Sequence, residues 1–331
     1  MRVAVLGAGA IGGTIGALLS RGGHEVEVTA RGDNLAALRS DGLRLDGAWG
    51  SVHAQVTASE TLTRAPELAF VTTKVPDAEA AMLGSARFLG GIPVVIVQNG
   101  MQSIETAERV LPDSHVVGGL ALYAASFVTG GRVAVTTAGP TYLGAPNPAS
   151  QDALARASEV LGAVMPVTTT DNFVGAQWTK LVVNQINALP AITGMSAQAV
   201  ISDRRLRRLL TRSIRELVRA AQAGGVRFAP LQGLTDGTLR ILGRMPLAVG
   251  QLLPQLMKLR MGATPNPGST LQSIRHGQLT EIDYLNGAVV EAGARAGVAT
   301  PVNRALVELV HEVERTHEFV TPEDVLRRVP R

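Results

Sequence analysis

The sequence contains no cysteine and few aromatic residues. Without cysteine the chain forms no disulfide, no thiolate metal site and no cysteine nucleophile, and we expect no metal. Aromatic residues make up 3% of the 331 positions, so Ala, Val and Leu must fill most of the core. No apolar run reaches the roughly 18 residues of a membrane-spanning helix, and the N-terminus has no recognisable signal peptide. We therefore expect a cytoplasmic protein.

Lysine is also scarce, with three positions against 28 arginines. Arginine supplies the general positive charge and cannot release a proton near neutral pH, whereas a desolvated lysine can. Lys74, Lys180 and Lys258 are therefore worth examining one by one. Lys258 falls in an apolar stretch, and we assign it no chemistry.

The net charge is +4, and the densest basic stretch covers residues 204–219. Its arginines recur at helical spacing on one face, which could in principle meet phosphates. We interpret the stretch as a solvated helix face in which Glu216 pairs locally. The composition does not indicate a nucleic-acid partner.

Strand-like and helix-like segments alternate over the first half of the chain, which predicts a parallel sheet. The later short strands indicate hairpin-like pieces. The strand-like runs cover residues 2–6, 24–30, 68–74, 93–100, 116–127, 132–137 and 141–146.

Helical periodicity replaces this pattern beyond about residue 175. We predict an α/β Rossmann domain with a parallel twisted sheet over 1–172, followed by an all-α substrate and catalytic domain over 173–331. The apolar stretch 238–262 is interrupted by Pro246 and Pro254. We interpret it as core or subunit-interface packing, compatible with a homodimer, rather than as a helix on a membrane surface.

A glycine motif joins the first strand to the first helix, and its candidate cofactor-binding residues are Gly7, Gly9, Ala10, Ile11 and Gly12. Gly7 permits a tight turn, Gly9 lets the backbone approach a pyrophosphate, and Gly12 allows the helix to pack closely on the strand. The helix N-terminus then faces the negative charge of the ligand. The motif predicts dinucleotide binding.

The end of the second strand indicates which dinucleotide is bound. NAD enzymes usually carry an acidic residue there for the ribose 2′-hydroxyl. Here Glu27 lies within the strand, and the strand ends in Thr29, Ala30 and Arg31. A guanidinium at Arg31 suits a 2′-phosphate by charge and geometry. The sequence therefore favours NADP(H) over NAD(H).

Two polar residues follow later strands of the same predicted sheet. Lys74 ends the third strand and Asn99 follows the fourth. Both positions fall at carboxyl ends of strands, where a doubly wound sheet presents residues to its ligand. Lys74 could meet a cofactor phosphate or a substrate carboxylate, and Asn99 could bind the substrate or the nicotinamide ribose.

The most informative helix carries Lys180, Asn184 and Asn187 on one face at i, i+4 and i+7. The rest of that helix is apolar, and polar groups on a buried helix are costly unless they are partnered. A structural hydrogen-bond network would explain the asparagines but not the amine, so we interpret Lys180 as functional. Pro190 removes the hydrogen bond to the carbonyl of Ile186 and could kink the helix. A carboxylate such as Glu281 near the amine would hold and tune it.

Several motifs together closely resemble the ketopantoate reductase (2-dehydropantoate 2-reductase) family. They occur in the expected order over nearly the whole chain, and TEIDYLNG is the most specific of them. The motifs are GAGAIG (7–12), VTTK (71–74), VQNGM (97–101), WTKLVVN (178–184), STLQS (269–273) and TEIDYLNG (280–287). The resemblance implies a Rossmann domain, an all-α domain and an active site in the cleft between them.

The resemblance also implies an activity, the reduction of ketopantoate to pantoate by NADPH on the way to pantothenate and coenzyme A. By position, Lys180 matches the family's catalytic lysine, which gives a proton to the keto oxygen. Glu281 matches the family's glutamate near that lysine and the cofactor. Such a mechanism is physically coherent, because a positioned ammonium stabilises and then protonates the oxygen on which charge builds.

Binding roles follow by position in the same way. Arg31 matches the arginine for the 2′-phosphate, and Lys74 and Asn99 match positions that contact cofactor and substrate. Asn184 and Ser269 match residues that bind the carboxylate and hydroxyl ends of the substrate. With Asn99 and Asn187 they form the candidate substrate site.

The sequence departs from the family pattern at one informative place. The family's second asparagine usually falls eight residues after the lysine, whereas Asn187 is seven after it and Ala188 occupies the usual position. The stretch 225–268 is also longer and more apolar than is typical. We therefore keep two alternatives open: a related NADP-dependent reductase of another 2-oxo acid, and a dinucleotide-binding sensor without turnover.

Overall fold

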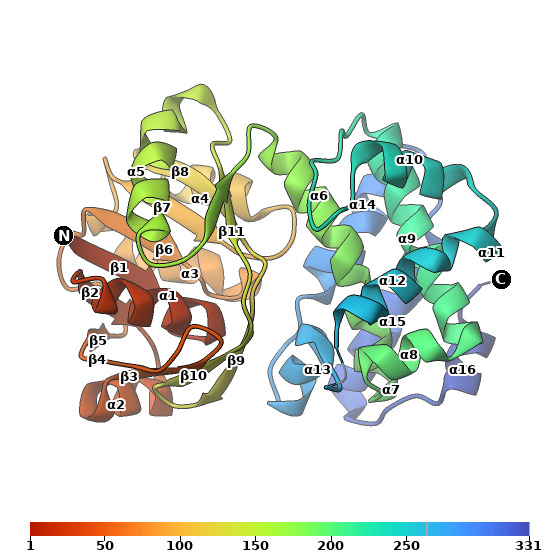
Figure 1. Cartoon of the computed structure of the whole chain (residues 1–331), viewed down its shortest axis with the longest axis horizontal. Coiled ribbons are helices and arrows are strands. Elements are labelled where there is room, and N and C mark those ends of the chain that lie inside the picture. Colours follow the sequence, from red (N-terminus) through yellow and green to blue (C-terminus); the bar gives the residue numbers. More distant parts are fainter. Residues whose placement is uncertain (263, 331) are drawn as a thin grey trace. The chain divides into compact units, whose positions relative to one another are not determined.

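The structure is a computed structural model that describes residues 1–262 and 264–330. It divides into two compact units, Met1–Phe173 and Val174–Arg331. The first is an α/β domain and the second a helical domain (Figure 1). The predicted fold class is confirmed.

The larger sheet of the N-terminal domain has the strand order β12-β11-β8-β7-β6-β1-β2-β5. All neighbouring strands are parallel except β8 and β11. The strand order reverses between β1 and β6, which is where a doubly wound sheet binds its ligand. The strands are β1 (Arg2–Leu6), β2 (Glu25–Thr29), β5 (Thr57–Ser59), β6 (Leu68–Val71), β7 (Pro93–Val97), β8 (His115–Ala121), β11 (Thr141–Gly144) and β12 (Val167–Thr169).

Helical segments connect these strands, as parallel pairing requires. Five of the strands, β1, β2, β6, β7 and β8, have their central residues buried, in keeping with a sheet covered on both faces. The helices of this domain are α1 (Ala10–Arg21), α2 (Gly32–Asp41), α3 (Val75–Ser85), η1 (Ala86–Phe88), α4 (Ser103–Val110), η2 (Pro148–Ser150) and α5 (Gln151–Gly162).

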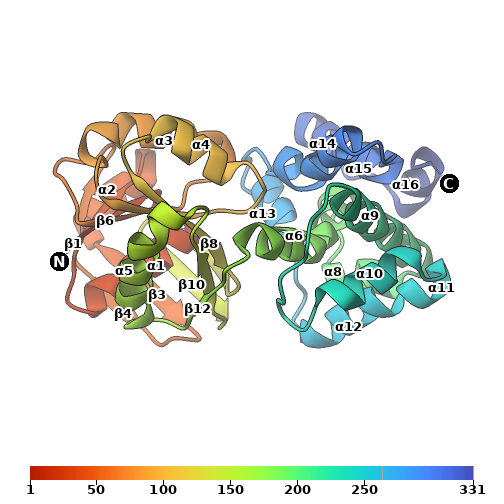
Figure 2. The ribbon, with the colours of Figure 1, turned by 90° about the horizontal axis from the view of Figure 1, so that it is seen from above.

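A second, four-stranded sheet covers α1 from the other side (Figure 1, Figure 2). Its order is β4-β3-β10-β9, formed by β3 (Leu43–Gly47), β4 (Val52–Ala54), β9 (Ala124–Thr129) and β10 (Arg132–Thr137). Glycines let α1 fit between the two layers: a Cβ on Gly13 would lie 2.8 Å from Val133 of β10. One on Gly16 would lie 3.4 Å from Val28 of β2. The helix is consequently buried from Gly12 to Leu19.

This second sheet corrects one sequence prediction. The run 116–127 was expected to be one extended segment, but β8 ends at Ala121 and β9 begins at Ala124 in the other sheet. Between them Tyr123 is buried with its ring edge-on to Trp49, at 5.0 Å between centroids. The expected hairpin is present as β9 and β10, joined through Gly131 at φ +67°.

The helical domain is built around the long helix α9, against which α10, α14 and α15 pack. Among its described residues the β pairing consists of one isolated bridge, Leu231 to Leu234. Its helices are α6 (Phe173–Asn184), η3 (Gln185–Asn187), α7 (Ala188–Thr193), α8 (Ala197–Ser202), α9 (Arg204–Ala223), α10 (Asp236–Arg244), α11 (Leu247–Gly250), α12 (Leu252–Arg260), α13 (Gly268–Arg275), η4 (Asp283–Gly287, a π-helical turn), α14 (Ala288–Arg295), α15 (Pro301–Thr316) and α16 (Pro322–Arg328).

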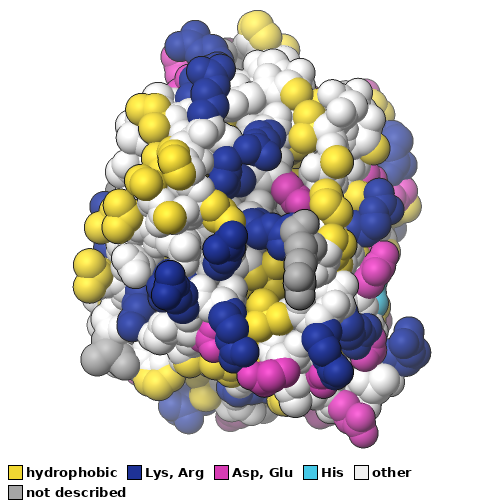
Figure 3. Space-filling view, turned by 90° about the vertical axis from the view of Figure 1, so that its right-hand side faces the viewer, with side chains coloured by type: hydrophobic (Ala, Val, Ile, Leu, Met, Phe, Trp, Pro, Cys, Tyr) yellow, Lys and Arg dark blue, Asp and Glu magenta, His cyan; other side chains and the backbone are white. Residues whose placement is uncertain are grey.

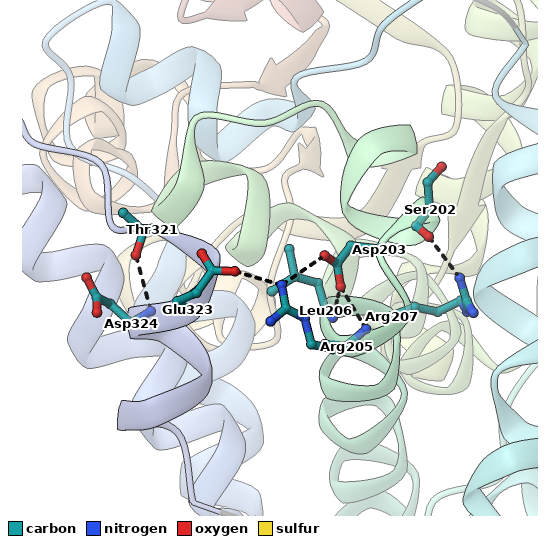
Figure 4. Close-up of polar contacts among 8 residues, drawn as sticks. All are labelled: Ser202, Asp203, Arg205, Leu206, Arg207, Thr321, Glu323 and Asp324. Atoms are coloured by element: carbon teal, nitrogen blue, oxygen red, sulfur yellow. Dashed lines mark hydrogen bonds and ion pairs between the residues drawn. The ribbon is translucent and has the colours of Figure 1, made fainter.

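Helix α9 begins at a well-formed cap. The Asp203 carboxylate accepts from the backbone N–H of Arg205 (2.7 Å) and of Leu206 (3.0 Å). The Arg205 guanidinium in turn bridges Asp203 to Glu323 of α16 (Figure 4). The sequence had suggested that Glu216 pairs locally with the arginines of α9, but in the described residues it does not. Its carboxylate instead accepts from backbone N–H groups at the start of α15.

The apolar stretch 238–262 forms α10, α11 and α12, and part of it is exposed. Leu252, Leu256 and Leu259 are 56%, 55% and 78% exposed, while Met257 faces inward. Core packing is therefore the wrong interpretation for these leucines, which follow i, i+4, i+7 spacing on the outer side of α12. On the face drawn in Figure 3, apolar side chains lie next to many Lys and Arg side chains. In the described residues no helix is long and apolar enough to cross a membrane.

Candidate active site

The glycine turn after β1 is held by hydrogen bonds from neighbouring strands. Gly7 has φ +98°, and its N–H donates to the Thr29 hydroxyl at 3.0 Å. The Thr72 hydroxyl at the end of β6 donates to the Gly7 carbonyl at 2.8 Å. A Cβ on Gly12 would lie 2.0 Å from that same carbonyl, so glycine is required there. The turn is therefore fixed before any ligand arrives.

Gly9 has the opposite surroundings. It is the N-cap of α1, without a side-chain cap, and no other described atom lies within 4 Å of where its Cβ would be. The N–H groups at Ala10 and Ile11 begin the helix and have no carbonyl one turn earlier within it. This open, positively polarised helix start suits an anion such as a pyrophosphate.

The two charged residues of β2 and its end are placed very differently. Glu27 is buried, and its Oε1 accepts from the Ser59 hydroxyl (3.0 Å) and from the Thr63 N–H (2.8 Å) and hydroxyl (2.9 Å). Its carboxylate thus ties β2 to the segment after β5. Arg31 is exposed at the N-cap of α2. A cationic rather than an acidic side chain is accordingly available just past the end of β2.

Lys74 and Asn99 lie past the carboxyl ends of the adjacent parallel strands β6 and β7. Lys74 is the N-cap of α3, and Asn99 precedes Gly100, which has φ +92°. Gln98 connects the two strand ends, because its Nε2 donates to the Thr73 carbonyl at 2.7 Å. The sheet therefore brings both candidates to the same edge as the glycine turn.

In the helical domain, Lys180 lies on α6 between buried Thr179 and Leu181. Burial lowers the pKa of Lys180 to about 8, and the negative charge of Glu281 acts in the opposite direction. The Thr179 hydroxyl donates to the carbonyls of Gly175 and Ala229 and so anchors this part of the helix. Lys180 is thus an amine whose pKa is lowered toward neutral pH and which feels the charge of the Glu281 carboxylate.

Helix α6 ends at Asn184 and continues as the 3₁₀ turn η3 before α7 begins. The interruption lies just before Pro190, whose ring would clash with the carbonyl four residues earlier in a continuous α-helix. In a 3₁₀ turn residues three apart eclipse, so Asn187 lies in line with Asn184. The Asn187 side chain is buried and donates to the Ser269 hydroxyl at 3.3 Å. The structure therefore brings Asn187 and Ser269 together.

Some residues of these sites were not singled out from the sequence. Thr29 and Thr72 hold the glycine turn, and Asn34 of α2 donates to the Ala8 carbonyl at 3.0 Å. Their side chains act on backbone atoms of segments far away in the chain, which no local pattern reveals. Among the described residues, His, Asp and Glu side chains form no group that could hold a metal ion.

Comparison with known proteins identifies the family. A family model described as ketopantoate reductase PanE/ApbA matches residues 3–148, and one described as its C-terminal domain matches residues 172–314. The chain belongs to the ketopantoate reductase family. It is thereby an oxidoreductase of an NAD(P)-dependent reductase family, and the resemblance noted in the sequence is confirmed.

Curated relatives support this assignment along the full length. The chain is 29% identical over 315 residues to a 2-dehydropantoate 2-reductase of Archaeoglobus fulgidus, which covers 95% of this chain and 98% of that protein. It is 28% identical to the 2-dehydropantoate 2-reductase of Halobacterium salinarum, with 95% and 99% covered.

Solved structures have the same fold. A PanE/ApbA family ketopantoate reductase from Ralstonia eutropha is 28% identical with a TM-score of 0.81, covering 95% of this chain and 99% of that one. A D-mandelate dehydrogenase in ternary complex with NADH and anilino(oxo)acetate is 21% identical with a TM-score of 0.83, covering 96% and 99%. At that identity the second likeness concerns the fold alone.

Proposed function

We propose that this chain reduces 2-dehydropantoate (ketopantoate) to pantoate with NADPH, a step in pantothenate and coenzyme A biosynthesis. The observation that carries the proposal is the partly buried Lys180, whose pKa is lowered to about 8 beside the charge of Glu281. A proton donor for a keto oxygen needs an acid of this strength near neutral pH. Family membership and curated relatives named 2-dehydropantoate 2-reductase support the reaction.

The N-terminal domain fits a dinucleotide, which when bound supplies the hydride. In this proposal Gly9, Ala10 and Ile11 hold the pyrophosphate, Gly7 and Gly12 shape the turn, and Arg31 binds the 2′-phosphate. Support comes from the open surroundings of Gly9 and from the exposure of Arg31. Glu27 is buried, and its Oε1 already accepts three hydrogen bonds within the domain, so it is poorly placed to bind a ribose hydroxyl.

Lys74 and Asn99, at the ends of β6 and β7, would contact cofactor and substrate. Asn184, Asn187 and Ser269 would bind the carboxylate and hydroxyl ends of the substrate. The hydrogen bond between Asn187 and Ser269 supports a shared role for that pair.

The chemical step assigned to this chain is a proton transfer. As the keto carbon gains hydride, its C=O π bond breaks and the electron pair moves onto oxygen. The ammonium of Lys180 gives its proton to that oxygen and is left as a neutral amine, which regains a proton from solvent. Glu281 stabilises the ammonium form between turnovers. A positioned cation at developing negative charge is among the strongest catalytic devices.

The experiment is NADPH oxidation with a panel of 2-oxo acids, with NADH alongside. Fast turnover of ketopantoate supports the proposal. Turnover of a different acid alone would establish the related reductase, an alternative suggested by the shifted Asn187. NADPH binding without turnover of any acid would establish the sensor. Preference for NADH would overturn the NADP assignment, and the NADH bound by D-mandelate dehydrogenase makes that comparison necessary.

We further propose that a second copy of this chain covers the exposed side of α12, forming a homodimer. The regularly spaced Leu252, Leu256 and Leu259 support a self-complementary contact about a two-fold axis. Light scattering of wild type and of Leu256→Asp tests this proposal, since a dimer would become a monomer. The cytoplasmic location expected from the sequence stays a prediction.

A further inference from the structure

A buried polar network occupies the interior of the helical domain, away from solvent. Gln185 of η3, Ser213 of α9, Asn286 of η4 and Asn303 of α15 each have 0% exposure. Four different helical segments therefore place an amide or a hydroxyl at one point of the core.

Asn286 is the central donor of this network. Its Nδ2 donates to Gln185 Oε1 and to Asn303 Oδ1, both at 2.9 Å. The Asn303 amide is fixed in turn, because its Nδ2 donates to Glu216 Oε2 at 2.8 Å and to the Ser213 carbonyl at 3.1 Å. The Ser213 hydroxyl lies 2.6 Å from Gln185 Oε1 and 3.0 Å from Asn303 Oδ1, and it can donate its proton to either oxygen. Oxygen acceptors on both sides of Nδ2 fix the orientation of the Asn286 amide.

The network lowers the free energy of unfolding relative to an apolar core. Within the described part of the chain, Gln185 Nε2 and Asn286 Oδ1 are buried without a hydrogen-bond partner. Such groups keep the cost of losing water without regaining a bond. Apolar side chains of similar volume would avoid that cost. Packing alone therefore does not account for amides at these two positions.

The positions of Gln185 and Asn286 in the chain provide a reason for placing amides there. Gln185 follows five residues after Lys180 on the continuous segment α6–η3. Asn286 follows five residues after Glu281, whose carbonyl accepts from Tyr284 N–H (3.0 Å) and Leu285 N–H (3.1 Å) at the start of the π turn. The Gln185–Asn286 bond thus joins the segment carrying the amine to the segment carrying the carboxylate. π turns within α-helices are frequent at functional sites.

We propose that Gln185 and Asn286 are positioning residues that hold Glu281 where its charge acts on Lys180. Neither touches the reacting atoms in this proposal, which rests on the proposed function. Buried hydrogen bonds suit this task because they fix direction as well as distance, whereas apolar contacts tolerate sliding.

The test compares Asn286→Leu with Ser213→Ala. Asn286→Leu keeps the branching and the number of side-chain heavy atoms and removes the donor that joins the two segments. Ser213→Ala removes a hydroxyl that faces the same two acceptors, Gln185 Oε1 and Asn303 Oδ1, but keeps both partners of the Gln185–Asn286 bond. We expect Asn286→Leu to lower kcat at least tenfold, with the alkaline fall in kcat moved to lower pH. We expect Ser213→Ala to keep the wild-type pH profile, and both variants to keep wild-type NADPH affinity.

A double variant separates positioning from stability. Gln185→Leu with Asn286→Leu removes both unpartnered groups and should unfold at a higher temperature than the wild type. The proposal expects its kcat to stay low, and full recovery of kcat would overturn it. A wild-type pH profile in Asn286→Leu would do the same. If Asn286→Leu does not fold, Gln185→Met breaks the bond from the other side and decides the question by the same readouts.

Other titratable groups on these elements are controlled separately. Glu216 of α9 meets Asn303, while Asp283 of η4 meets His311, whose other ring nitrogen meets Glu314. A His311→Gln variant reports whether this second cluster contributes to the pH profile. Lys180→Ala tests the proposed function itself. If that variant is inactive while Asn286→Leu behaves as wild type, the positioning role alone is refuted.

Discussion

The lowered pKa of Lys180 makes a quantitative prediction about alkaline pH. The step requires the ammonium form, so the rate should follow the protonated fraction of this group. With a pKa of about 8, that fraction falls from roughly nine-tenths at pH 7 to roughly one-tenth at pH 9. The rate should therefore drop about tenfold over this range. A lysine with the ordinary pKa of 10.5 would lose only about 3% of its protonated form.

The assay is single-turnover oxidation of bound NADPH from pH 6.5 to pH 10, with saturating ketopantoate. Single turnover is needed because slow product release can hide the chemical step in kcat. Lys258→Ala is the matched control, since Lys258 bonds to Ser202 on the surface and has no proposed chemistry. Its profile should equal that of the wild type.

The Glu281→Gln variant tests the direction in which the pKa of Lys180 moves. Removing the charge that raises the pKa of Lys180 leaves the lowering by burial unopposed. The alkaline fall should then begin at lower pH than in the wild type. A wild-type rate that stays flat to pH 9.5 would refute the donor assignment, and so would a fall that moves to higher pH in Glu281→Gln.

Three further predictions concern the cofactor and stability. Arg31→Ala should weaken NADPH binding in calorimetry by about 10- to 100-fold, the range of a charge-assisted hydrogen bond, and leave NADH nearly unchanged; equal losses would contradict the 2′-phosphate role. Gly12→Ala forces a clash with the Gly7 carbonyl and should abolish NADPH binding. Gly162→Ala should be tolerated in both binding and thermal unfolding, because a Cβ at Gly162 would have no described atom within 4 Å outside its chain neighbours and the backbone of its own helix. Burial acts to raise the pKa of Asp203, but backbone hydrogen bonds from Leu206 and Arg205 outweigh it, so the pKa is lowered. The cap's stability is therefore present above the unfolded pKa near 3.8 and is lost as pH falls through the folded pKa. In urea unfolding at pH 7, Asp203→Ala should lower the free energy of unfolding by about 1 kcal/mol, and Asp203→Asn should lower it much less. If the loss in Asp203→Ala stayed the same in acid, this would contradict a contribution of the carboxylate charge to the cap.

The elements nearest the glycine motif could be predicted because their signals are local. The strand–glycine–helix order at residues 2–21 specifies the turn, and the parallel sheet follows from the alternation of segments. The small sheet was missed because its strands come from residues 43–54 and 124–137, which pair over a long distance in the chain and pack together on α1. Nothing in either segment alone indicates that partner.

In the candidate site, too, the local pattern could be predicted and the long-range contacts could not. The spacing of Lys180, Asn184 and Asn187 placed them on one face, and the break before Pro190 preserved that alignment. The sequence spaces Ile282, Leu285 and Val289 on one helical face, and all three are buried. It did not indicate the π turn between them or the contacts of Gln185 and Asn286, because these depend on α9 and α15. The roles assigned to the site residues stay predictions.

The enclosure of α1 between two sheets has a consequence for hydrogen exchange. Its amides from Gly12 to Leu19 are buried on every side, so they can exchange with solvent only when the N-terminal domain opens as a whole. The same helix presents the proposed pyrophosphate site at its first turn. A bound dinucleotide therefore protects a structure that is already closed, and its binding energy should appear as slower exchange throughout this helix rather than as local ordering of a loop.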